Sequence, residues 1–220
     1  KLAKAKRPNV GLTLSPHKEA ARFLKDSHPN FNNCYGAVPA CIFACVGARC
    51  GQGRLRTSEI ARIGRTVALE LYQDQSDRLI IAELNKAIRR AEKNGARLAW
   101  RPNIAHDAAA MAARLSRQVN ADAYDYTAIL ENLYRCDGVQ RILSYKGHNM
   151  ADIMTALSQG YGVAIVADIG KEDPKPATWR GYPVIDGDLD DLWIDRIPPG
   201  NTGFAVMLYA KGNLAQKAEA

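Results

Sequence analysis

The sequence has no long hydrophobic run. Apolar stretches such as Gly162–Ala167 are far shorter than the roughly 18 consecutive apolar residues that a membrane-spanning helix needs. The first seven residues include three lysines and an arginine, and they lack the apolar core of a secretion signal. We therefore expect a cytoplasmic protein that does not associate with a membrane.

Cysteine is also scarce, at 5 of 220 residues. Because no secretion signal is visible, we do not expect these cysteines to form disulfide bonds. The chain is long enough to bury a core without them, and its hydrophobic content of 47% and charged content of 24% exclude wholesale disorder. We predict one α/β domain over residues 1–220, on which residues 1–56 form an irregular, basic, cysteine-rich segment.

Acidic residues are few in the first half of the chain. Residues 1–100 contain 18 Lys and Arg against 8 Asp and Glu, whereas residues 101–220 contain 12 against 15. The overall net charge is +7. The excess of positive charge favours an anionic partner such as a nucleic acid or a nucleotide. An unevenly charged, solvated surface is the alternative interpretation.

Strand-like and helix-like patterns alternate from residue 97 onward. The predicted strands cover residues 10–14, 97–102, 123–127, 139–145, 162–168 and 204–209, whereas residues 171–202 are predicted to be loop-rich. This alternation predicts a parallel sheet built from βαβ units. Right-handed crossovers would curl it into an open, partial barrel of about six βα units, or into a doubly wound sheet. In both architectures, ligands bind beyond the C-terminal ends of the strands.

Four of the five cysteines fall within 17 residues: Cys34, Cys41, Cys45 and Cys50. Thiolates this close in sequence can converge on one metal. The spacing C-x6-C-x3-C-x4-C differs from that of zinc knuckles and is closer to that of iron–sulfur loops. We therefore predict either a zinc ion or an iron–sulfur cluster, with buried structural thiols as the alternative. Cys136 stands alone and is expected in the core.

Polar side chains near the predicted strand ends are candidates for catalysis: Asn103, Asp107, Tyr126 and Ser144. Asp107 could instead cap the next helix, and Tyr126 could fill the core. A second set of candidates, for binding Mg²⁺ or substrate, is acidic: Asp186, Asp188 and Asp191. An exposed acidic turn is the alternative for this set, because Asp-Gly favours turns.

Five arginines of the basic half could contact phosphates: Arg49, Arg54, Arg56, Arg62 and Arg65. Two functional hypotheses follow from these features. The first is a metal- or iron–sulfur-containing enzyme that acts on a nucleic acid or nucleotide. The second is a non-catalytic, nucleic-acid-binding accessory protein with a structural zinc site. A host-interaction protein on an enzyme-like scaffold is a third possibility.

The order of these pieces resembles a family of phage and plasmid proteins related to phage gene product 88. The matching segments are Leu14-Ser15-Pro16-His17, Cys34, Cys41, Cys45, Ala61-Arg62, residues 101–107, 124–127, 143–144, 163–167 and 181–191, and Lys211-Gly212. The resemblance implies a phage or plasmid origin and a bacterial host, but no activity. The layout is also similar to a radical-SAM-type partial barrel, although that superfamily uses C-x3-C-x2-C and this chain has Cys41-x3-Cys45-x4-Cys50.

Overall fold

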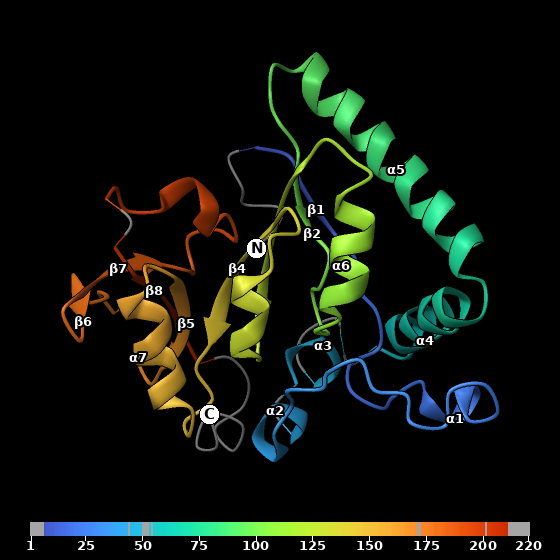
Figure 1. Ribbon diagram of the computed structural model, residues 1–220, viewed down its shortest axis with the longest axis horizontal. Coiled ribbons are helices and arrows are strands. Elements are labelled where there is room, and N and C mark those ends of the chain that lie inside the picture. Colours follow the sequence, from blue (N-terminus) through green and yellow to red (C-terminus); the bar gives the residue numbers. More distant parts are fainter. Residues whose placement is uncertain are drawn as a thin grey trace.

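The computed structural model describes residues 7–43, 45–49, 53, 55–170, 173–200 and 202–210. Its centre is an eight-stranded sheet with the order β1-β2-β3-β4-β5-β8-β7-β6 (Figure 1). The strands are β1 (Asn9–Gly11), β2 (Ala99–Arg101), β3 (Asp122–Thr127), β4 (Val139–Ser144), β5 (Gly162–Ala167), β6 (Thr178–Trp179), β7 (Tyr182–Asp186) and β8 (Phe204–Tyr209).

The strands from β1 through β5, β8 and β7 pair in parallel, and β6 pairs antiparallel to β7. The α/β class and its mostly parallel sheet are therefore confirmed. The sheet is open, with β1 and β6 at its edges, and the predicted barrel of six units is not confirmed. The two extra strands, β6 and β7, lie in the segment predicted as loop. They were missed because β6 has only two residues and β7 contains Pro183, which weakens a strand pattern.

The longer helices are α4 (Arg56–Leu71), α5 (Gln73–Lys93), α6 (Ala109–Ser116) and α7 (Met150–Ser158). Short helices α1 (Ala21–Leu24), α2 (Pro39–Phe43) and α3 (Val46–Arg49) interrupt the segment predicted to be irregular, and η3 (Leu130–Tyr134) and η4 (Trp193–Arg196) are single 3-10 turns. Across the described ranges, none of the helices combines the length and apolarity that crossing a membrane requires.

Alternating side chains divide the core between the two faces of the sheet. On one face, Trp100 contacts α5 and α6, and Leu143 belongs to a cluster with α7. On the other face, Tyr124 and Ile142 contact Trp193 of η4. Figure 1 shows α5 and α6 beside β1 and β2, and α7 beside β5 and β8. The helices and η4 thus leave the C-terminal edge of the sheet to the connecting loops.

Candidate functional site

A cavity of about 930 Å³ lies at the C-terminal ends of the central strands. Its wall includes Arg101 of β2, Thr127 of β3, Ser144 of β4 and Val166 of β5. The structure brings all four residues predicted to be catalytic to this wall, together with three of the cysteines: Asn103, Asp107, Tyr126, Ser144, Cys34, Cys41 and Cys45. This is the edge where parallel α/β sheets bind their ligands.

Two glycines allow the cysteine-bearing segment to lie close against the strand-end loops. A Cβ atom at Gly47 would lie 2.2 Å from the Cβ of Ala105, and one at Gly36 would lie 2.7 Å from the Cβ of Ala128. The ammonium group of Lys146 donates to the carbonyls of Gly36 (2.9 Å) and Ala128 (2.8 Å). The loops after β2, β3 and β4 therefore hold this segment over the cavity.

Cys34 is the cysteine with the best-defined surroundings. His17 has a φ of 45°, in the left-handed region that non-glycine residues rarely adopt, and its N–H donates to the Cys34 Sγ at 3.2 Å. Burial raises the pKa of Cys34 to about 11, although backbone hydrogen bonds from His17 and Asp107 act to lower it. Burial also raises the pKa of Cys45. Both thiols are therefore protonated at neutral pH unless a metal displaces the proton.

The predicted metal site stays a prediction. Cys50 lies outside the described residues, and Cys41 lies in α2. Within the described ranges, no three His, Cys, Asp or Glu side chains are grouped so that they could hold a metal ion. Cys136 was expected in the core but is exposed, because it falls in the connection between η3 and β4.

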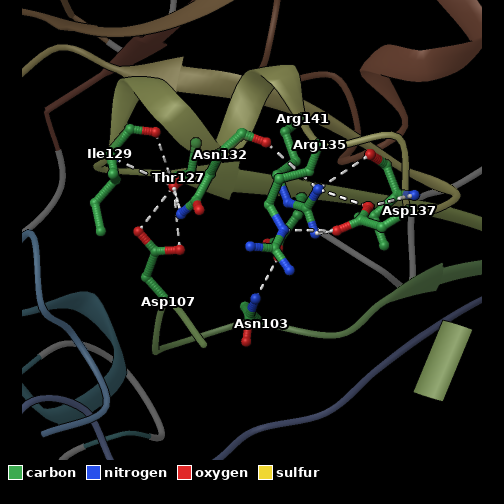
Figure 2. Close-up of polar contacts among 10 residues, drawn as sticks. Asn103, Asp107, Thr127, Ile129, Asn132, Arg135, Asp137 and Arg141 are labelled. Carbon is green, nitrogen blue, oxygen red and sulfur yellow. Dashed lines mark hydrogen bonds and ion pairs between the residues drawn. The ribbon is translucent and has the colours of Figure 1, made fainter. Parts of the chain in front are cut away.

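Asn103 and Asp107 use their side chains to join neighbouring loops. Asn103 Nδ2 donates to Asp125, and its Oδ1 accepts from the N–H of Ala108 (3.2 Å). The carboxylate of Asp107 accepts a hydrogen bond from the Thr127 hydroxyl (3.0 Å), which Figure 2 shows, and another from the N–H of Ala128 (2.7 Å). Asp107 does not cap α6, and burial raises its pKa.

The three candidate aspartates separate into two places. Asp191 forms an ion pair with Arg101 (2.8 Å) on the face of the sheet that η4 covers, and it accepts from the hydroxyl of Tyr126 (3.4 Å). Asp186 and Asp188 instead share the ammonium group of Lys175, at 2.8 and 3.3 Å. The acidic turn follows β7, a strand that the sequence pattern did not predict.

Two residues on the cavity wall have side-chain polar atoms that make no hydrogen bond to the described residues. The Ser144 hydroxyl makes no hydrogen bond within the described ranges. His106 is 6% exposed, and neither of its ring nitrogens has a hydrogen-bond partner among the described residues. Burial, together with the nearby charge of Arg101, lowers the pKa of His106 to about 3. His106 lies between Asn103 and Asp107 in the connection from β2 to α6, and its sequence position alone does not separate it from them.

A family model described as gene product 88 matches residues 1–220. The chain belongs to the gene product 88 family. No curated protein and no solved structure matches it. The resemblance to gene product 88 is therefore confirmed, whereas the radical-SAM-type layout is not.

In this gene product 88 protein, the arginines predicted to contact phosphates have different surroundings. Arg62 has a 3% exposed side chain that pairs with Glu19 (3.0 Å). Arg56 is exposed and pairs with Glu59 (2.9 Å), and Arg65 is exposed and donates to a backbone carbonyl. The side chain of Arg49 and the whole of Arg54 lie outside the described residues.

Proposed function

We propose that this gene product 88 protein is a metal- or iron–sulfur-containing enzyme of phage or plasmid origin that acts on a nucleotide, free or within a nucleic acid. One observation carries the proposal. Three cysteines of one short segment lie on the same 930 Å³ cavity as the polar residues at the ends of three parallel strands, β2, β3 and β4. Such cavities at the C-terminal edge of parallel sheets are where α/β enzymes hold their substrates.

In this proposal, at least three of Cys34, Cys41, Cys45 and Cys50 would hold the metal, and metal binding would bring the three described thiols closer together than they lie in the structure. The N–H of His17, which points at the Cys34 sulfur, would stabilise that sulfur as a thiolate ligand. The bound group would supply either Lewis-acid or electron-transfer chemistry. The protein's own side chains would bind and orient the substrate, and His106 and Ser144 would contact it. Asn103, Asp107 and Tyr126 would hold the cavity wall in place.

The second candidate is a nucleic-acid-binding accessory protein with a structural zinc site. The excess of positive charge in residues 1–100 supports it. Two of the arginines on which it depends already have carboxylate partners, because Arg62 pairs with Glu19 and Arg56 with Glu59. A large cavity is also not needed for a closed structural zinc site. We therefore favour the enzyme.

Single cysteine substitutions test the proposal. We expect Cys34→Ser, Cys41→Ser and Cys45→Ser each to lose most of the metal that the wild-type protein carries after anaerobic purification. Cys136→Ser is the matched control, because Cys136 is exposed and lies outside the cavity wall. Metal content that is unchanged in all three cavity variants would contradict the assignment of these ligands.

A further inference from the structure

His106 is the least satisfied polar side chain on the cavity wall. It lies in the connection between β2 and α6, and both ring nitrogens are buried with no hydrogen-bond partner in the part of the chain that the structure describes. Buried polar groups in native proteins almost always have such a partner, so each exception calls for an explanation. The imidazole lines the cavity, but neither ring nitrogen is exposed to it, so a ligand in the cavity can supply the partner only when the ring turns toward it.

The polar side chains around His106 already form ion pairs or hydrogen bonds with other protein groups. Arg101 pairs with Asp191, and its guanidinium group stacks on the ring of Tyr126 at 4.4 Å. The side-chain amide of Asn103 donates one hydrogen bond and accepts another. The carboxylate of Asp107 accepts hydrogen bonds from Thr127, the last residue of β3, and from the N–H of the residue that follows Thr127. These neighbours hold the cavity wall and leave the imidazole for a molecule inside it.

The charge state of the imidazole limits what that molecule can be. The pKa of His106 is lowered to about 3, so at neutral pH one ring nitrogen donates and the other accepts. A neutral ring of this kind does not balance the charge of a phosphate. The other charged side chains of the wall comprise equal numbers of basic and acidic residues: Arg62, Arg101 and Lys146, and Glu19, Glu59 and Asp107. The part of the wall formed by His106 therefore suits an uncharged group that offers a hydrogen-bond donor or acceptor.

We infer that His106 recognises the base of the substrate, by hydrogen bonds between its imidazole and the edge of a nucleobase. Rotation about the Cβ–Cγ bond, which is a soft torsion in histidine, would present a ring nitrogen to the cavity. This inference rests on the proposed function, because it takes the cavity as the nucleotide site. It assigns base recognition to His106 and leaves metal binding to the cysteines.

The test compares His106→Leu, His106→Asn and the wild-type protein. Leucine removes the unpartnered nitrogens, whereas the asparagine amide keeps one donor and one acceptor. We expect urea to unfold His106→Leu at the same concentration as wild type or at a higher one, because a buried unsatisfied group is lost. By calorimetry with adenosine, guanosine, cytidine and uridine, at least one nucleoside should bind the wild type. Its affinity should fall by at least about tenfold in His106→Leu and less in His106→Asn.

The control is His28→Leu, since His28 lies outside the cavity wall and its replacement should leave nucleoside binding unchanged. A clearly lower urea midpoint for His106→Leu would mean that the imidazole has a partner in the ligand-free protein, which overturns the inference. Unchanged nucleoside affinity in His106→Leu, or no nucleoside binding by the wild type, overturns it as well. The metal content of the wild type tests the metal-enzyme proposal independently of nucleoside binding. Metal on the cysteines would support that proposal even if no nucleoside binds, and metal-free protein would contradict it.

Discussion

At the scale of single residues, Asp125 has the most consequential ionisation. Its carboxyl group is 1% exposed, and it accepts from Asn103 and from the N–H of Tyr126 (2.8 Å). Burial raises the pKa of Asp125 to about 8, although the charge of Arg101 acts to lower it. In the folded protein this carboxyl group therefore stays protonated at pH values where the unfolded chain has already ionised it.

This difference predicts how stability depends on pH. Between about pH 4 and pH 8 the unfolded state binds fewer protons than the folded state, so the free energy of unfolding should fall as pH rises. One such group contributes a slope of up to about 1.4 kcal/mol per pH unit. We expect wild type to lose up to about 3 kcal/mol more than Asp125→Asn between pH 5.5 and 7.5, measured by urea unfolding. Equal losses in both proteins would show that Asp125 is ionised when folded.

Residue positions were more predictable than residue roles. Asn103, Asp107, Tyr126 and Ser144 were selected because each follows or ends a predicted strand, and all four line the cavity. Their partners could not be predicted, because a hydrogen bond such as that from Thr127 to Asp107 joins loops 20 residues apart. For the same reason, the sequence pattern could not show that His106, unlike Asn103 and Asp107, has no hydrogen-bond partner among the described residues.

At the scale of elements, the segment that carries η4 closes one face of the sheet. Trp193 lies edge-on to Tyr124 with ring centroids 6.0 Å apart, and Leu192 is buried beside it. Asp191 joins this segment to β2 through its ion pair with Arg101. Among the described residues, this pair fixes how the η4 segment meets the C-terminal ends of β2 and β3.

Removing one partner of this ion pair should loosen the η4 segment. We expect Asp191→Ala to lower the free energy of unfolding by about 3–5 kcal/mol, because Arg101 is left as a buried charge. The double variant Asp191→Leu/Arg101→Met should recover part of that loss. Glu83→Ala, on the exposed face of α5, is the control and should change stability by less than about 0.5 kcal/mol. An Asp191→Ala protein as stable as the control would contradict the structural role given to this pair.

Strands with a clear apolar pattern were predicted well. The strands β3, β4, β5 and β8 begin and end within about one residue of the predicted ranges. The strands β6 and β7 were missed, because Gly181 and Pro183 are typical of a turn and because β7 joins the parallel sheet only through β8, further along the chain. Tertiary pairing, not local propensity, makes this segment a strand.

At the scale of the whole molecule, parallel strands explain why distant residues converge. Strands that run the same way end at one edge, so residues from the loops after β2, β3 and β4 line one cavity. The cysteine segment follows β1, and Cys34, Cys41 and Cys45 line the same cavity. What the cysteines bind could not be predicted, since their spacing fits no single metal.

The measurement that tests the account most directly is the metal content of anaerobically purified wild-type protein. Zinc, iron and acid-labile sulfide would be quantified per chain, and a visible spectrum would be recorded on the same sample. We expect about one zinc ion, or iron and sulfide in the ratio of one iron–sulfur cluster with its visible absorption. Metal-free protein that keeps its full fold and stability would contradict the central claim that the cysteines of this cavity hold a metal.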